Sequence, residues 1–195
     1  MAQTKTQWRR DLVAARRALP PNQRAAHAMT IAARVRAVPA FASCRSLLTY
    51  EPLGAEVDAR TLASEVRLAP KAVFLPCWDA GEPTWVAWSA SIATPRACRP
   101  EPPLCVLAPG VGFDPRGVRL GRGQGFYDRA LARLRMDGGP VFVIGLGFEF
   151  QVVDALPCEA WDQPMDAIAT ELRLLTAEPG GSAEPRARAA EMGKP

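Results

Sequence analysis

Residues 119–129 carry side chains of the types that bind polyphosphates, at a spacing that suits this chemistry. Three alternate glycines are followed by an aromatic pair and an aspartate: Arg119, Leu120, Gly121, Arg122, Gly123, Gln124, Gly125, Phe126, Tyr127, Asp128 and Arg129. Glycine reaches positive φ and lets backbone N–H groups approach an anion closely. The arginines could neutralise phosphate charge, and Asp128 is placed to hold a divalent cation that bridges the phosphates.

The same pattern also has a purely structural interpretation. Short glycine motifs arise by chance, and this one could be a turn that caps a surface helix, with Phe126 and Tyr127 as packing residues. The only Gly-Lys pair, Gly193-Lys194, cannot form a Walker-type loop, and the glycines come too late for a dinucleotide fingerprint. A nucleotide site in this chain would therefore be of another kind.

The elements around the glycines favour a nucleotide site. An apolar run that ends at Pro109 predicts a buried strand upstream, and Phe126, Ala130 and Leu134 recur at helical spacing downstream. The β-branched run over residues 141–147 then predicts a strand that is covered on both faces. This order of strand, loop and helix places the glycines at the carboxyl end of a parallel sheet, where nucleotides bind.

The chain of 195 residues, 48% of them hydrophobic, suits one domain. We expect a single three-layer α/β/α domain over residues 1–176, Rossmann-like, with a mostly parallel sheet. Strands are expected near residues 45–50, 71–76, 104–108, 141–147 and 166–170. The Ala-, Gly- and Pro-rich residues 177–195 predict a disordered tail. Because the apolar runs are short and the N-terminus is polar and basic, we expect a cytoplasmic protein without a membrane partner. A monomer is also expected.

Positive charge is concentrated near the N-terminus. Residues 1–36 carry eight Lys or Arg against Asp11 alone. Helical spacing from Trp8 to Leu19 predicts one helix, and a second is expected from Gln23 to Ala37. This basic pair could bind nucleic acid, grip a nucleotide's phosphates or present solvated arginines only.

Two of these cations share one helix face. Lys5 and Arg9 are four residues apart and could contact an anion bound at the sheet edge.

The chain has one histidine, His27, and five scattered cysteines without a CxxC pair. Zinc clusters and Ser-His-Asp chemistry are thereby disfavoured, which leaves carboxylates, arginines, tyrosines and a bound ion to carry a reaction.

Further segments extend the pattern along the chain. These are Lys5-xxx-Arg9, Glu56-Val57-Asp58, Pro100-Glu101-Pro102, Ala108 to Asp114 with Gly117, Arg119 to Asp128, and Pro157-x4-Asp162-x3-Asp166 with Thr170-Glu171. In this order, over residues 5–171, the chain closely resembles the 5-formyltetrahydrofolate cyclo-ligase family. The block from Arg119 to Asp128 is its most distinctive part.

The resemblance implies an ATP- and Mg²⁺-dependent ligase. Such an enzyme converts 5-formyltetrahydrofolate into 5,10-methenyltetrahydrofolate and releases ADP and phosphate. The formyl oxygen attacks the γ-phosphate of ATP, folate N10 closes the ring, and phosphate leaves. This chemistry needs positioning and charge neutralisation more than a protein nucleophile, which suits a chain with one histidine.

The resemblance also implies roles for individual residues. The ATP-binding set is Lys5, Arg9, Arg119, Leu120, Gly121, Arg122, Gly123, Gln124, Gly125, Phe126 and Tyr127. The folate-binding set is Tyr50, Glu51, Glu56, Arg122 and Phe126; the Mg²⁺ ligands are Asp128 and Asp162; and the catalytic residues are Arg122, Tyr127 and Asp128. Glu56 is expected to begin a helix, where a carboxylate is favoured by the helix dipole. Trp78, Trp85 and Trp88 could wall the pterin site or pack in the core.

Two other hypotheses remain open at this point. A fold relative could use the same ATP loop on another substrate, which the phosphate motif does not exclude. A nucleic-acid-binding protein could use the basic N-terminal helices, although interleaved aromatic residues are missing there. We expect small-molecule substrates and no nucleic-acid partner.

Overall fold

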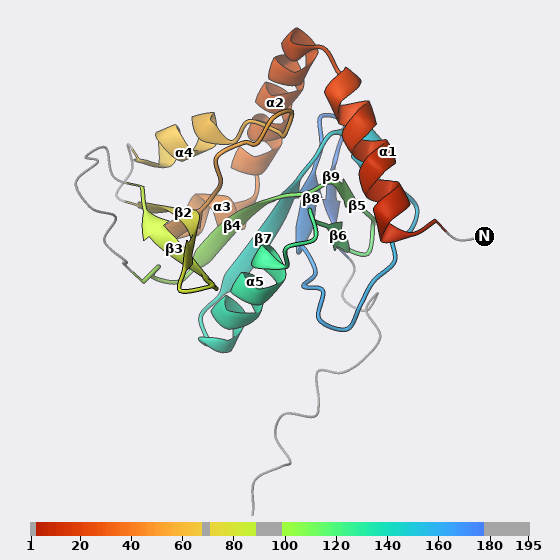
Figure 1. Ribbon diagram of the computed structural model, residues 1–195. Helices are drawn as coiled ribbons and strands as arrows, with labels where there is room; N and C mark the ends of the chain where they lie inside the picture. Colours follow the sequence, from red (N-terminus) through yellow and green to blue (C-terminus); the bar gives the residue numbers. More distant parts are fainter. Residues whose placement is uncertain (1–2, 68–70, 89–98, 178–195) are drawn as a thin grey trace, which may run out of the picture.

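The structure is a computed structural model that describes residues 3–67, 71–88 and 99–177. Its centre is a seven-stranded sheet with the order β3-β2-β1-β4-β7-β8-β9 (Figure 1). The strands are β1 (Ser46–Leu48), β2 (Ala72–Asp79), β3 (Glu82–Ala87), β4 (Leu104–Pro109), β7 (Val141–Leu146), β8 (Ala167–Ala169) and β9 (Leu174–Thr176). The five inner strands pair in parallel, and β3 and β9 pair antiparallel at the two edges. The expected mostly parallel sheet is confirmed.

Alternation along the strands supplies both faces of the sheet with apolar side chains. Leu47 and Leu107 belong to the core on one face, with helices α2 (Pro21–Arg36), α3 (Pro39–Ser43) and α4 (Arg60–Arg67). Their neighbours Leu48 and Val106 belong to the core on the other face, under α5 (Phe126–Met136). Near-continuous apolar strands are the consequence of this double coverage.

The N-terminal helix α1 (Lys5–Ala18) packs beside the sheet on a small hairpin of β5 (Gly112–Phe113) and β6 (Arg119–Leu120). Leu12 of α1 joins Val111, Val118 and Leu120 in a separate apolar cluster. A capping box of Thr4 and Gln7 begins the helix. The packing fixes α1 against the hairpin that leads into the glycine-rich segment.

Phe113 keeps the strand ends close together. Its ring is fully buried, and it lies against Gly110, Gly145 and Gly147. A Cβ atom at Gly110 would lie 2.4 Å from Cζ of this ring, and one at Gly145 would lie 2.5 Å from Cε1. Only glycine fits at these positions, so the C-terminal ends of β4 and β7 both pack against the Phe113 ring.

The structure corrects and extends the sequence predictions. Glu56 does not begin a helix; it lies in a loop, and α4 begins at Arg60. The second helix runs from Pro21 to Arg36 rather than from Gln23 to Ala37. Strands β3, β5, β6 and β9 were not expected, and residues 178–195 of the expected tail lie outside the described residues, as does Cys98. Among the described helices, none is both long and apolar enough to cross a membrane.

Candidate active site

A pocket of about 480 Å³ opens at the carboxyl ends of β1 and β4. The chain leaves β1 toward α4 on one face of the sheet and leaves β4 toward α5 on the other, so this is the topological switch point, where ligands bind in open α/β sheets. Tyr50 and Glu51 line the pocket just after β1, and Pro109 and Gly110 line it at the end of β4. The position of the pocket therefore follows from the topology.

All of the site residues predicted from the sequence line this one pocket. They are Lys5, Arg9, Tyr50, Glu51, Glu56, the ten residues from Arg119 to Asp128, and Asp162. They come from α1, the loop after β1, the segment from β6 into α5, and the loop before β8. Their placement together is observed, whereas their individual roles stay predictions.

The glycine-rich loop has the geometry of an anion cradle. Gly123 has φ 98° and Gly125 has φ 65°, both in the left-handed region that favours glycine. Gly125 is the N-cap of α5 and brings no side-chain hydrogen bond to the helix start. The first backbone N–H groups of α5 are therefore available to a ligand, and the helix dipole favours a negative charge there.

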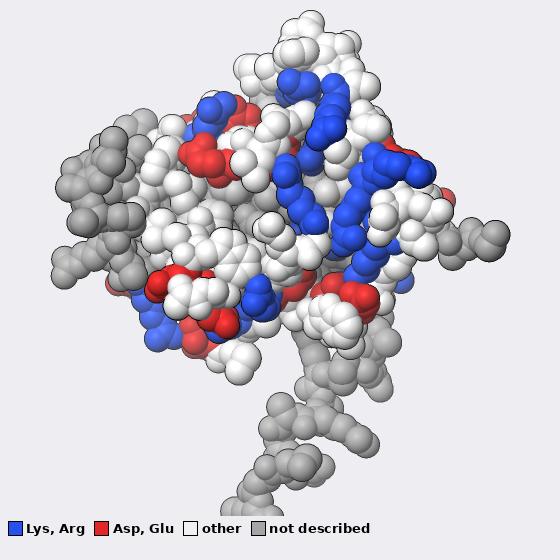
Figure 2. Space-filling model, in the orientation of Figure 1, with Lys and Arg blue, Asp and Glu red and all other residues white. Residues whose placement is uncertain are grey.

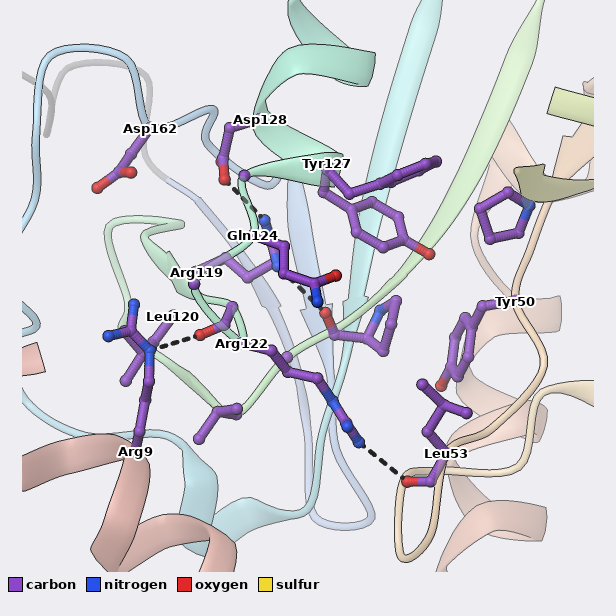
Figure 3. A pocket seen from close by; sticks show the side chains of 18 of the residues that line it. Arg9, Tyr50, Leu53, Arg119, Leu120, Arg122, Gln124, Tyr127, Asp128 and Asp162 are labelled. Carbon is purple, nitrogen blue, oxygen red and sulfur yellow. Dashed lines mark hydrogen bonds and ion pairs between the residues drawn. The ribbon is translucent and has the colours of Figure 1, made fainter. Parts of the chain in front are cut away.

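Helix α1 contributes two cations to one end of the pocket, where Figure 2 shows Lys and Arg side chains gathered along the helix. Arg9 Nε donates to the Gly121 carbonyl at 2.9 Å and so holds the glycine-rich loop (Figure 3). Lys5 Nζ lies 2.8 Å from Asp162 Oδ2 and 2.8 Å from Glu159 Oε2. Burial lowers the pKa of Lys5, but the hydrogen bonds to Asp162 and Glu159 outweigh this effect and raise it above its ordinary value.

Arg119 is the buried cation under the loop. Its side chain is 4% exposed, and Nη2 lies 3.1 Å from Asp128 Oδ2. Its guanidinium also lies over the Tyr127 ring, 5.0 Å from the centroid. Arg119 Nε and the Tyr127 hydroxyl have no hydrogen-bond partner among the described residues, and burial raises the pKa of Tyr127. These unpaired polar atoms are the kind that a bound ligand can satisfy.

Glu56 and Tyr50 form the opposite end of the pocket. The Glu56 side chain is only 6% exposed and accepts from Arg122 Nη2 at 3.0 Å, while Leu53 N donates to it at 3.0 Å. Arg122 reaches across the pocket from the glycine-rich loop toward Leu53 (Figure 3). Tyr50 donates to the Val57 carbonyl at 2.7 Å, and burial raises its pKa.

Two carboxylates suited to a metal lie at the same end of the pocket as Lys5. Asp128 pairs with Arg119, Asp162 pairs with Lys5, and the backbone N–H of Gln163 donates to Asp128 at 3.2 Å. Within the described ranges, no group of three or more His, Cys, Asp or Glu could hold a metal ion. Mg²⁺ usually takes only one or two carboxylates and completes its shell with water and substrate phosphate. The donor set fits an Mg²⁺ ion that arrives with a polyphosphate.

The aromatic residues divide between pocket and core. Trp78 lines the pocket and meets Phe126 edge to face at 5.1 Å, whereas Trp85 is buried against Phe126 and Tyr127. Trp88 packs against the core. Arg129 lies over the Trp78 ring at 4.9 Å and does not line the pocket.

Among the charged and aromatic residues near the site, sequence reasoning missed Glu159, Trp161 and Arg16. Glu159 and Trp161 line the pocket beside Asp162, and the Trp161 residue is 66% exposed. Arg16 is buried on α1 and donates to the Gly110 carbonyl at 3.0 Å. Its spacing from Lys5 and Arg9 follows the same helix face, a signal that could have identified it.

Fold and site together define a class: a doubly wound α/β domain with a pocket at its switch point that is lined by a glycine-rich loop and by both cations and carboxylates. A protein-family model described as the 5-formyltetrahydrofolate cyclo-ligase family matches residues 1–99 and 98–171. The chain belongs to the 5-formyltetrahydrofolate cyclo-ligase family, and it is an enzyme of the ligase class.

Individual relatives agree with the family model. The chain is 30% identical to the 5-formyltetrahydrofolate cyclo-ligase of Escherichia coli K12, over 82% of this chain and 96% of that protein. The cyclo-ligase of Mycolicibacterium smegmatis is 26% identical over 89% and 97% of the two chains.

Solved structures show the same fold. The Aquifex aeolicus 5,10-methenyltetrahydrofolate synthetase aligns with a TM-score of 0.72 and 27% identity, over 95% of this chain and 98% of that one. The Mycoplasma pneumoniae synthetase gives a TM-score of 0.74 at 24% identity, over 87% and 99%. The expected α/β fold and the expected family are both confirmed.

Proposed function

We propose that the protein converts 5-formyltetrahydrofolate into 5,10-methenyltetrahydrofolate with ATP and Mg²⁺, releasing ADP and phosphate. Family membership supports the reaction class. The observation that carries the proposal is the pocket of about 480 Å³, which has the glycine-rich loop with Lys5, Arg9 and Arg119 at one end and the nearly buried Glu56 at the other. A reaction between a polyphosphate and a donor-rich pterin needs these two ends.

The cationic end suits the phosphates of ATP. The left-handed glycines and the start of α5 offer backbone N–H groups, and Lys5, Arg9 and Arg119 offer positive charge. Lys5 would exchange its carboxylate partners for phosphate, and this would free Asp162. Asp162 and Asp128 would then hold Mg²⁺, which neutralises charge on the transferred phosphoryl group.

The carboxylate end suits the reduced pterin. Glu56 is a nearly buried carboxylate, and a carboxylate accepts hydrogen bonds from the N–H groups of a pterin edge. Unlike Asp128 and Asp162, Glu56 has no proposed Mg²⁺ beside it and would repel phosphate, which favours folate at this end of the pocket. Tyr50, Glu51 and Phe126 complete the folate-binding set, with Trp78 beside Phe126.

In the proposed reaction the formyl oxygen attacks the γ-phosphorus, the bond to ADP breaks, and an N5-iminium phosphate forms. Folate N10 then attacks the formyl carbon and loses its proton, and the C–O bond breaks to release phosphate. Arg122 lies between the two ends of the pocket and would stabilise negative charge on the transferred phosphoryl group. Tyr127 and, through Mg²⁺, Asp128 would bind the phosphates at the other side of that group. In this proposal the protein binds and orients the two substrates and neutralises charge on the phosphates.

The other assignments follow the same hypothesis. We propose a monomer that acts on small molecules in the cytoplasm. The basic side chains of α1 that line the pocket, Lys5 and Arg9, have anion-binding roles without a nucleic acid. We propose residues 1–176 as the single catalytic domain.

Release of ADP with different folates tests the substrate. Protein, MgATP and 5-formyltetrahydrofolate should yield one ADP per folate consumed, measured by chromatography. Tetrahydrofolate lacks the formyl oxygen and should give no ADP above the folate-free rate. Equal ADP release with both folates would contradict the proposed phosphoryl acceptor and favour a fold relative with another substrate.

A further inference from the structure

Arg16 is a buried cation that has no role in the proposed chemistry so far. It lies on α1, on the helix face that also carries Lys5 and Arg9, and its side chain is 4% exposed. Nη1 donates to the Gly110 carbonyl at 3.0 Å, and Nη2 lies 3.9 Å from Glu56 Oε1. Arg16 thus connects α1 to both sides of the switch point, the loop after β1 and the end of β4.

Burial of this guanidinium is costly, and a leucine or methionine on α1 would pack there without that cost. Burial lowers the pKa of Arg16, Glu56 raises it in opposition, and Nε has no hydrogen-bond partner among the described residues. A buried, incompletely hydrogen-bonded guanidinium at position 16 is explained if its positive charge acts on a neighbouring residue. The acidic group in contact with it is Glu56.

Glu56 has a second cationic partner of a different character. Arg122 is 52% exposed and sits on the glycine-rich loop, where an ion pair to Glu56 is open to water and salt. A bound polyphosphate would offer Arg122 more negative charge than the single carboxylate of Glu56 does. When Arg122 turns to the phosphate, Arg16 is the cation that stays beside Glu56.

We propose that Arg16 is a positioning residue that keeps the Glu56 carboxylate oriented for folate without touching either substrate. This inference rests on the proposed function, because it takes Glu56 as a folate contact. Arg122 is then the exchangeable partner of Glu56, and Arg16 is the permanent one. Folate affinity depends on Arg16, and nucleotide affinity does not.

Calorimetric titration with 5-formyltetrahydrofolate and with MgATP tests this assignment. Arg16→Met should weaken folate binding by about tenfold, or about 1.4 kcal/mol, and leave MgATP affinity at the parent value. The matched control is Arg17→Met, an exposed arginine on the same turn of α1, which should bind both ligands as the parent does. In the Glu56→Gln background, Arg16→Met should have little further effect on folate binding.

Arg16→Lys keeps the experiment decisive if Arg16→Met does not fold. Lysine retains the charge but cannot contact Gly110 and Glu56 together, so a smaller loss confined to folate is expected. Parallel losses for folate and MgATP, or a full independent loss in the Glu56→Gln background, would assign Arg16 to general folding. A parent protein that binds no 5-formyltetrahydrofolate would overturn the proposed function, whereas parent-like folate binding by the Arg16 variants would overturn only this inference.

Discussion

The two ends of the pocket, the proposed phosphate end around Asp128 and the proposed folate end around Glu56, are built in different ways. The centre of the phosphate end is one local segment, the glycine-rich loop between Arg119 and Asp128, to which α1 adds Lys5 and Arg9 and the loop before β8 adds Asp162. The folate end is assembled from distant segments: Arg122 reaches Glu56 across 66 positions of the chain, and Phe126 lies beside Trp78 of β2. A phosphate site can be specified by one local turn, whereas the folate end exists only once the sheet has brought separate loops together.

The largest effect is expected at the phosphate end. Asp128→Asn should lower turnover by about 100-fold or more, because it removes a charge that would neutralise Mg²⁺ and leaves Arg119 without its ion-pair partner. Initial rates at saturating MgATP measure this, with thermal unfolding as the check on folding. Asp137→Asn, at the far end of the same helix, is the control and should keep the parent rate. Full activity in Asp128→Asn would return Asp128 to a helix-capping role.

The next effect concerns Lys5, which joins α1 to the phosphate end. Lys5→Ala should raise the KM for ATP by an amount equivalent to about 1.5–3 kcal/mol, the usual worth of a hydrogen bond to a charged group. The KM for folate should change little, since Lys5 pairs with Asp162 and Glu159, whereas Glu56 pairs with Arg122.

Lys71→Ala is the matched control for Lys5. Lys71 donates to the Phe41 and Ala42 carbonyls and does not line the pocket, so its loss should leave both KM values unchanged. An unchanged KM for ATP in Lys5→Ala would make the N-terminal helix purely structural.

The smallest effect is expected at the folate end, and it sharpens the contrast between the two ends. Glu56→Gln should weaken binding of 5-formyltetrahydrofolate by more than about 1 kcal/mol, because a charge-assisted hydrogen bond becomes a neutral one. Binding of MgATP should stay the same. Calorimetry measures both affinities, and Glu65→Gln on α4, an exposed partner of Arg36, serves as control. Equal losses of affinity for 5-formyltetrahydrofolate and MgATP would contradict the assignment of the two substrates to separate ends of the pocket.

The contrast also explains what the sequence could predict. The strands near residues 104–108 and 141–147 and the glycine-rich loop were predictable because apolar runs and left-handed glycines are local signals. The edge strands β3 and β9 were missed because their pairing with β2 and β8 depends on tertiary contact.

Glu56 and Arg16 show where local reasoning fails. A helix start was expected at Glu56 from its charge and its neighbours, but its carboxylate is held by Arg122 and the Leu53 N–H in a loop. The hydrogen-bond acceptor of Arg16, the Gly110 carbonyl, is 94 positions away. Sequence spacing places such a residue on a helix face, but only the fold supplies its partner.

The most direct test of the central claim is the absorbance of 5,10-methenyltetrahydrofolate on mixing the protein with 5-formyltetrahydrofolate, ATP and Mg²⁺. We predict that the absorbance rises only when all of these components are present, and that EDTA stops the rise because Mg²⁺ and the phosphates bind together at Asp128 and Asp162. A rise of equal rate without ATP or in EDTA, or no rise with every component present, would contradict the account.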